Sequence, residues 1–334
     1  MAATIKDIAR ETGLSIATVS KYMNGAKLRE KNRIAIERAI KKLDYTVNEY
    51  ARGLKSNKSR TIGVVIPELS NVFVTQIITQ MEEILRSKGY SIMICDCHTD
   101  EQLECEAVRF LIGKMVDGIV NMPVCQDGKH LKPAIDKNIP IVLIDRPIES
   151  LAGIADSVLI DNTAASKMAI SYLIERGHRD IGIIIGPEQV FTSKQRLKGY
   201  FDAFSAHGFT VNQENVFYSD YTVQGGHESM RQLLQNRNCT AVFVTNYEMT
   251  LGAVIAANEM GLKIPDDISL IGFDNMEISR VTHPPLTIVT QPLEQIGTHV
   301  AKRLLEHLMS DTPSTPITIS LSTSLQEGAS VRRI

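Results

Sequence analysis

The chain has 334 residues, 43% of them hydrophobic, so it is too long for one typical domain and too apolar for an intrinsically disordered protein. Its net charge of −2 conceals two opposed regions, because the first 60 residues carry 14 Lys+Arg against 6 Asp+Glu, or +8, and the other 274 carry −10. Clustered Lys and Arg displace counterions from phosphates, so this asymmetry indicates a nucleic-acid-binding arm on an acidic body.

Membrane insertion and secretion are both disfavoured. No apolar run approaches the roughly 18 residues of a membrane-spanning helix. Lys6, Asp7, Arg10 and Glu11 interrupt the stretch where a secretory signal needs an apolar core. Five cysteines are too few, and odd in number, for a disulfide framework. We therefore expect a cytoplasmic protein without membrane contact.

Three short helices are predicted before residue 47, and they form one small basic domain. Thr4 and Asp7 have capping-box spacing, in which side chains satisfy backbone N–H groups at a helix start. The third helix carries a one-sided apolar stripe that can pack on the first two. The helices are predicted at Ile5 to Thr12, from the cap Ser15 to about Met23, and at about Glu30 to Leu43, with Gly13 and Asn24-Gly25 as the breaks.

A fourth helical segment, Asn48 to Lys55, precedes a polar and basic run that ends at Arg60 and has the composition of a linker. The predicted domains are therefore residues 1–47, a connecting segment 48–60, and a body formed by 61–334.

The body alternates short apolar runs with amphipathic helices, a pattern typical of parallel sheets in an α/β fold. A new start near Asp161, after the irregular segment Glu149 to Asp156, suggests two similar halves with the default ligand site in the cleft between them. The strand-like runs are Thr61 to Ile66, Tyr90 to Cys95, Gly118 to Val120, Ile141 to Ile144, Ile181 to Ile185, Ala241 to Val244 and Ile268 to Ile271.

A helix, a turn with glycine and a second helix form the helix-turn-helix arrangement. At roughly 100° per residue, Ala17 and Lys21 centre one face of the second helix, and Val19 and Met23 point to the core. Lys21 can donate to guanine, and Ala17 or Ile16 can touch a thymine methyl. The alternative is that this face is merely solvated and the domain is a protein-interaction module. The charge of +8 on the first 60 residues favours DNA binding over this alternative.

Several motifs carry a family resemblance over nearly the whole chain. The segments are Thr4-Ile-Lys-Asp-Ile-Ala9, Gly13-Leu-Ser-Ile-Ala-Thr-Val-Ser-Lys21, Asn24-Gly25, Asn48-Glu-Tyr-Ala-Arg-Gly-Leu54 and Thr61-Ile-Gly-Val-Val-Ile66. They resemble the lactose and galactose repressor (LacI/GalR) family. The resemblance implies a homodimer whose helix-turn-helix heads bind a pseudo-palindromic operator in double-stranded DNA, with paired hinge helices in the minor groove.

The resemblance also implies a core like that of periplasmic binding proteins, with two parallel-sheet subdomains. The first comprises about 61–160 plus 291–322, and the second about 161–290 plus 323–334. The DNA-binding residues that the head and hinge then supply are Thr4, Ile16, Ala17, Thr18, Ser20, Lys21, Asn24, Arg33, Asn48, Ala51, Leu54 and Lys55.

The hinge segment is too short to be a stable helix alone, and Gly53 weakens it by about 1 kcal/mol relative to alanine. It should form only with DNA and a partner hinge. Leu54 is then the apolar wedge that parts a base step, and Ala51 permits close approach. The alternative is a flexible tether in which Leu54 is merely packed.

Matching the family's motifs places a set of effector-binding residues around the predicted cleft. Their donors and acceptors suit vicinal hydroxyls, and their aromatic rings suit a sugar or a base, so a sugar or sugar derivative is expected. The alternative for each residue alone is strand-end capping or surface polarity. The set is Ser70, Phe73, Asp145, Arg146, Arg196, Tyr221, Asn246, Asp274 and Gln291.

Catalytic and cofactor motifs are absent from the sequence, which contains no phosphate-binding glycine loop, nucleophile elbow or zinc-protease motif. Cys95-Asp-Cys97-His98 with Cys105 could be drawn as a metal site but lacks a second ligand pair. We therefore expect no enzyme activity, no cofactor and no metal.

Two other functions stay open beside an effector-controlled repressor. A regulator of the catabolite-control type would answer to a phosphorylated protein partner, although the helix Glu248 to Gly261 has no arginine to grip a phosphoserine. A sugar-processing enzyme or a transport binding protein is the third hypothesis.

Overall fold

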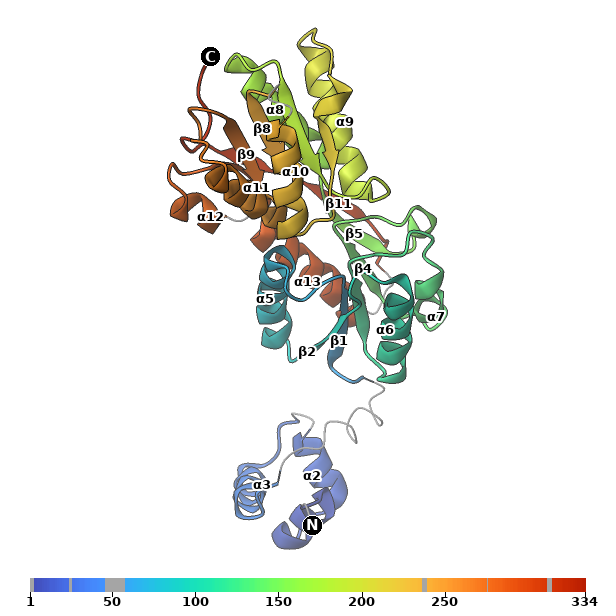
Figure 1. Ribbon diagram of the computed structural model, residues 1–334. Helices are drawn as coiled ribbons and strands as arrows, with labels where there is room; N and C mark the ends of the chain where they lie inside the picture. The colour runs from blue at the N-terminus through green and yellow to red at the C-terminus, as the bar shows by residue number, and fades with distance from the viewer. Residues whose placement is uncertain (1–2, 24–25, 46–57, 236–238, 275, 311–313) are drawn as a thin grey trace. The chain divides into compact units, whose positions relative to one another are not determined.

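The computed structural model divides the chain into two compact units, residues 1–60 and 61–334 (Figure 1). It describes residues 3–23, 26–45, 58–235, 239–274, 276–310 and 314–334. The predictions that lie outside the described residues are those for Asn24 and for the segment 48–55, including Asn48, Ala51, Leu54 and Lys55.

The first unit contains the three predicted helices, α1 (Ile5–Thr12), α2 (Ile16–Met23) and α3 (Glu30–Lys42). Gly13 ends α1 in the left-handed conformation, with φ at +65°, which glycine adopts without steric cost. One residue from each helix is fully buried, namely Ile8, Val19 and Ile36. The predicted helical head with a small apolar core is therefore confirmed.

Two six-stranded sheets form the second unit. The first contains β1 (Thr61–Ile66), β2 (Ser91–Asp96), β3 (Gly118–Asn121), β4 (Ile141–Ile144), β5 (Asp156–Ile160) and β11 (Thr318–Leu321), in the spatial order β11-β5-β4-β3-β1-β2. The second contains β6 (Ile181–Ile185), β7 (Val216–Tyr218), β8 (Ala241–Val244), β9 (Ser269–Phe273), β10 (Thr287–Thr290) and β12 (Ser324–Gln326), in the order β12-β10-β9-β8-β6-β7.

All described strand pairs are parallel except β10 with β12, so the predicted α/β fold with two parallel sheets is confirmed apart from this edge. The longer helices between the strands are α5 (Val72–Ser87), α6 (Glu101–Gly113), α8 (Asn162–Glu175), α9 (Phe191–Ala206), α10 (Val223–Gln235), α11 (Tyr247–Glu259) and α13 (Leu293–Met309). The shorter ones are η1 (Lys129–Leu131), α7 (Lys132–Ile135), η2 (Glu149–Leu151), η3 (Gln213–Asn215) and α12 (Met276–Val281). No described helix combines the length and the apolarity needed to cross a membrane.

The chain passes between the two sheets three times, after β5, after β10 and between β11 and β12. The late segments therefore return to the first sheet. There α13 packs against α5, and β11 lies beside β5, so that red and blue-green parts of the ribbon are neighbours in Figure 1. The two sheets share one apolar core cluster, in which Val64 of β1 and Ile183 of β6 are both fully buried.

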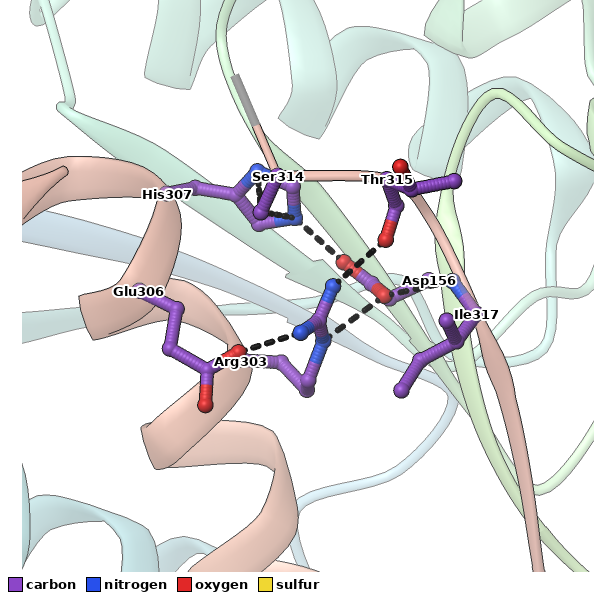
Figure 2. A network of polar contacts seen from close by, with 7 residues as sticks. All are labelled: Asp156, Arg303, Glu306, His307, Ser314, Thr315 and Ile317. Carbon is purple, nitrogen blue, oxygen red and sulfur yellow. Dashed lines mark hydrogen bonds and ion pairs between the residues drawn. The ribbon is translucent and has the colours of Figure 1, made fainter. Parts of the chain in front are cut away.

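Asp156 begins β5, so the prediction of an irregular segment as far as Asp156 is wrong at its end. Polar partners from α13 and from the chain before β11 surround this carboxylate (Figure 2). Its two oxygens accept from Arg303 Nε at 2.9 Å, His307 Nε2 at 2.5 Å and the backbone N–H of Ile317 at 2.9 Å. This network ties the end of α13 and the chain before β11 to the first sheet.

Candidate functional site

The face of α2 that was predicted to read base edges is exposed. Ile16 is 46% exposed, and Ala17 and Lys21 are exposed beside it. On the opposite side Val19 is fully buried and Met23 packs against the core of the head. The helix therefore presents a cation and small apolar groups to the outside, as base-edge contacts in a major groove require.

Hydroxyl groups at the helix starts of the head have partners within the head. The Asp7 carboxylate accepts both the backbone N–H and the hydroxyl of Thr4, at 2.9 and 2.7 Å. Ser15 Oγ accepts the backbone N–H of Thr18 at 3.2 Å and lies 2.9 Å from its hydroxyl. Both predicted capping positions are thus confirmed, and Thr4 and Thr18 have a structural role at these ends.

Arg33 is exposed on α3 and paired within the same helix. Its Nη1 lies 2.9 Å from Glu37 Oε1, and Glu30 lies at 3.9 Å on the other side. Tyr22 donates to the same Glu37 oxygen at 3.0 Å. Ser20, the remaining described member of the predicted set, is half-buried on α2.

A cavity of about 700 Å³ lies between the two sheets of the second unit. Parallel strands of both sheets point their carboxyl ends at it, which is where open α/β sheets bind ligands. Lining residues lie one or two positions after the end of most of these strands: Pro67 after β1, Met122 after β3, Asp145 after β4, Pro187 after β6, Asp220 after β7, Asn246 after β8, Asp274 after β9 and Gln291 after β10.

Eight of the nine predicted effector residues line this cavity, namely Phe73, Asp145, Arg146, Arg196, Tyr221, Asn246, Asp274 and Gln291. The structure does not bring Ser70 to it. Ser70 is exposed and donates its hydroxyl to Glu68, while the next residue, Asn71, lines the cavity and caps α5 by accepting the N–H of Val74 at 3.3 Å.

Arg196 on α9 is the most firmly held cation of the cavity wall. Its side chain donates to Asn162 Oδ1 at 2.7 Å and to the backbone carbonyl of Thr245. The guanidinium carbon lies 3.9 Å from the centre of the Phe273 ring, so a cation–π contact fixes the plane of the group. Only 4% of Arg196 is exposed, which keeps its charge effective at short range.

Asp274 lies on the same wall of the cavity as Arg196, and it has few hydrogen-bond partners for a buried carboxyl group. Gln291 donates its Nε2 to Asp274 Oδ1 at 2.5 Å, and Gln291 Oε1 has no partner among the described residues. Burial raises the pKa of Asp274 to about 7 although Arg196 and Gln291 oppose this shift, and the charges of Asp145 and Glu248 add to it. This acid therefore changes charge near neutral pH.

Tyr221 and Asn246 form a second group on the same side. The Tyr221 hydroxyl lies 2.7 Å from Ser193 Oγ and 3.1 Å from Thr192 Oγ1. Asn246 caps α11 by accepting the N–H of Met249 at 3.0 Å, and its amide donates to the Tyr221 carbonyl at 3.3 Å. Asn246 therefore fills the capping role as well as lining the cavity.

The opposite wall comes from the first sheet. Arg146 Nε lies 3.3 Å from Asp145 Oδ2, and its Nη1 donates to the Pro123 carbonyl at 3.2 Å. Phe73, in the first turn of α5, adds a half-buried aromatic ring to this side. A charged pair and an apolar ring therefore lie across the cavity from Arg196 and Asp274.

The sequence analysis missed further polar lining residues, among them Thr192, Lys194, Asp220 and Glu248. Thr192, Lys194 and Glu248 lie in the first turn of α9 or α11, two to four positions from the predicted residues Arg196 and Asn246. The signal that could have found them is this helical spacing after a strand end. Glu248 is half-buried, and burial raises its pKa together with the nearby charge of Glu68.

Comparison with known proteins agrees with both parts of this arrangement. Residues 4–48 match the model for bacterial regulatory proteins of the lacI family, and residues 170–331 match a periplasmic binding protein-like domain. The chain is 36% identical over 313 residues to catabolite control protein A of Priestia megaterium, which covers 93% of each chain. The chain belongs to the lacI family of bacterial regulatory proteins.

Solved structures of similar regulators extend over the same length. The lac repressor dimer bound to operator and the anti-inducer ONPF has a TM-score of 0.89 at 25% identity and covers 99% of this chain and 100% of that one. A complex of the transcriptional regulator CelR with cellobiose has a TM-score of 0.74 at 28% identity and covers 98% and 99%. As a lacI-family member the chain is a DNA-binding transcriptional repressor with a ligand-binding core, and its relatives are regulators, not enzymes.

Proposed function

We propose that this lacI-family member represses genes for the use of a sugar, and that a sugar or sugar derivative in the 700 Å³ cavity controls its affinity for DNA. It acts in the cytoplasm, as a homodimer on a pseudo-palindromic operator. The observation that carries the proposal is the convergence of eight effector candidates from two sheets on one cavity. A CelR regulator of the same fold binds cellobiose, which supports a carbohydrate ligand here.

The charges of the cavity favour an uncharged ligand over a sugar phosphate. Among the described lining residues seven are acidic and three are basic. The acidic ones are Glu68, Glu101, Asp145, Glu149, Asp220, Glu248 and Asp274, and the basic ones are Arg146, Lys194 and Arg196. Arg146 is already close to Asp145, so a phosphate would enter a field of like charge. Hydroxyl groups can instead both donate to carboxylates and accept from Arg196.

The head provides the DNA contacts of the proposal. Lys21, Ala17 and Ile16 form the exposed strip of α2 that contacts base edges. The other described candidates contact the sugar-phosphate backbone of the DNA, and they are Thr4, Thr18, Ser20 and Arg33. The hinge residues 48–55 couple the head to the ligand-binding core. The ligand changes the affinity for DNA only because it binds the DNA-binding conformation of the protein and the other conformation with different free energies. This difference is typically about 1 to 3 kcal/mol.

The experiment that tests this function is fluorescence anisotropy of the purified full chain on DNA from upstream of its own gene. Pools of neutral sugars, sugar phosphates and nucleobases are added separately. We expect specific binding that the neutral-sugar pool changes, and its direction identifies an inducer or a co-repressor. A response only to sugar phosphates would contradict the charge argument, and a lack of specific DNA binding would contradict the function.

Base reading by α2 gives a further test. Lys21→Ala should weaken binding to cognate DNA by about 1 to 3 kcal/mol with little effect on random DNA. Lys41→Ala, which removes an exposed charge at the end of α3, is the charge-matched control. Leu54→Ala should chiefly reduce DNA bending and specific affinity. Equal losses on cognate and random DNA for Lys21→Ala would show that Lys21 contacts phosphate.

A protein signal is the second candidate, and it is favoured by the 36% identity to catabolite control protein A. The surface after Asn246 speaks against it, because α11 carries no arginine and its Glu259 pairs with His227 at 2.8 Å. Specific DNA binding that is indifferent to every small-molecule pool would favour this candidate.

A further inference from the structure

A buried cluster beside the cavity contains three side chains of the kinds that bind transition metals. Glu104 on α6, Cys125 after β3 and His130 in η1 each offer one ligand atom, and these atoms all lie within 4.8 Å of one another. Glu104 is completely buried, and Cys125 and His130 are each 7% exposed. No other such group occurs among the residues that the structure describes.

Hydrogen bonds within this cluster leave two of its buried polar atoms, Asn121 Oδ1 and His130 Nδ1, without a partner among the described residues. Asn121 Nδ2 lies 2.9 Å from Glu104 Oε1 and 3.2 Å from His130 Nε2, and His130 Nε2 lies 3.3 Å from Glu104 Oε1. If Nε2 carries a proton, it donates to Glu104 Oε1, which also accepts from Asn121 Nδ2, and the lone pair of Nδ1 is left without a donor. If Nε2 carries a lone pair, it faces a carboxylate oxygen with no hydrogen between them.

The separation of His130 Nε2 and Glu104 Oε1 fits two ligands on one zinc ion. Zn–N and Zn–O bonds of about 2.0 to 2.2 Å at tetrahedral angles place the two ligand atoms about 3.3 to 3.6 Å apart. The distance here is 3.3 Å. Asn121 then keeps its hydrogen bond to the Glu104 carboxylate, which is the outer contact that ligating carboxylates usually have.

The pocket also offers hydrogen-bond partners for a water molecule that would be the fourth ligand of the metal. Asn121 Oδ1 and His130 Nδ1 are buried and have no partner among the described residues. A water on the metal would donate to an acceptor such as Asn121 Oδ1. We therefore propose that Glu104, Cys125 and His130 bind zinc(II), with water in the fourth position.

Zinc suits this donor set better than other common ions, because one thiolate, one imidazole and one carboxylate combine soft and borderline ligands. The three residues lie on separate elements with spacings of 21 and 5 positions, so no sequence motif shows them. This proposal departs from the expectation of no metal site, which rested on sequence spacing alone.

The site would brace one wall of the ligand cavity. Cys125 and its neighbours Val124 and Gln126 line the cavity, and Cys125 would be a metal ligand on the same loop. Without metal, Glu104 still holds this loop by accepting the N–H groups of Val124 at 3.2 Å and Cys125 at 2.6 Å. The two explanations differ in whether a stoichiometric metal is present.

The test uses the full chain, stripped with a chelator and titrated with cobalt(II). We expect one cobalt per chain, the charge-transfer absorption of a cobalt–thiolate bond, and loss of that absorption when zinc is added. No such band in the wild-type chain would overturn the proposal, whatever the variants do. Glu104 and His130 would then be only an ion pair that holds the loop.

The variants assign the ligands. Cys125→Ser should abolish the band, and His130→Ala should weaken cobalt binding at least tenfold. Cys239→Ser is the matched control, because Cys239 is a partly buried thiol packed in a different apolar cluster, and it should keep the band. Circular dichroism checks that each variant is folded. A band that survives in Cys125→Ser would place the metal elsewhere and contradict the proposed site.

Discussion

Two buried carboxyl groups of the core, Asp156 and Asp274, are surrounded in opposite ways. Asp156 is 1% exposed and accepts hydrogen bonds from Arg303, His307 and the backbone of Ile317 (Figure 2). Both of its oxygens are used, and both of its side-chain partners come from α13. This group has its full set of partners inside the protein, so its role is to hold chain segments together.

Asp274 is 8% exposed and receives one side-chain hydrogen bond, from Gln291. Burial raises its pKa to about 7 against the attraction of Arg196. The protein therefore leaves this group short of partners at the wall of the cavity, where a ligand hydroxyl can complete them. The difference shows how a buried acid serves stability when it is saturated and serves binding when it is not.

The largest effect is expected at the saturated site. Asp156→Asn leaves the Arg303 charge, which is 11% exposed in its side chain, without its buried partner. Loss of one member of a buried ion pair costs about 3 to 5 kcal/mol of unfolding free energy. Urea unfolding followed by circular dichroism measures this loss. A change below about 1 kcal/mol would show that the network of Figure 2 contributes little.

A smaller effect, with a definite pH dependence, is expected at Asp274. Its pKa is about 7 in the folded chain and about 3.9 when unfolded, so between these values the folded chain holds a proton that the unfolded chain has released. The unfolding free energy therefore falls as pH rises from 4 to 7. Asp274→Asn removes this contribution.

The measurement compares urea unfolding of the wild type and Asp274→Asn at pH 5 and pH 7. The wild type should lose about 2 kcal/mol more than the variant over this interval. Other titrating groups are common to both chains and cancel in the difference. Equal losses in the two chains would mean that Asp274 is already ionised at pH 5.

The smallest effect is expected at the outer end of the Asp156 network. Arg303 also pairs with Glu306, whose side chain is 53% exposed. Exposed ion pairs contribute about 0 to 1 kcal/mol, so Glu306→Gln should change the unfolding free energy by less than about 1 kcal/mol. Thermal unfolding of this variant beside Asp156→Asn separates the buried contact from the exposed one. A loss as large as that of Asp156→Asn would contradict the ranking.

The sequence predicts the strands that are buried on both faces and contain only apolar residues. Ile141–Ile144, Ile181–Ile185 and Ala241–Val244 are strands with the predicted bounds, because a strand covered on both faces has a continuous apolar run. It does not predict β11 and β12, which lie at sheet edges and contain exposed polar residues. Nor does it predict the start of β5, since Asp156 looks like a loop residue until its partners from α13 are known.

The cavity could be predicted residue by residue where a motif marks the end of a strand. Asp145, Asn246 and Asp274 are of this kind, and each lines the cavity. The prediction for Ser70 is wrong because its hydroxyl donates to Glu68, a local hydrogen bond that no sequence pattern reveals. The cluster of Glu104 with Cys125 and His130 could not be predicted, since folding alone brings its three elements together.

The most direct test of the central claim is the DNA affinity of the full chain with and without the neutral-sugar pool, measured by fluorescence anisotropy for the wild type, Asp274→Asn and Glu306→Gln. The account predicts that the pool changes the affinity of the wild type and of Glu306→Gln by roughly 5- to 150-fold and leaves Asp274→Asn unchanged. An equal response in all three chains would contradict it, because the ligand would then act without the under-partnered acid of the cavity.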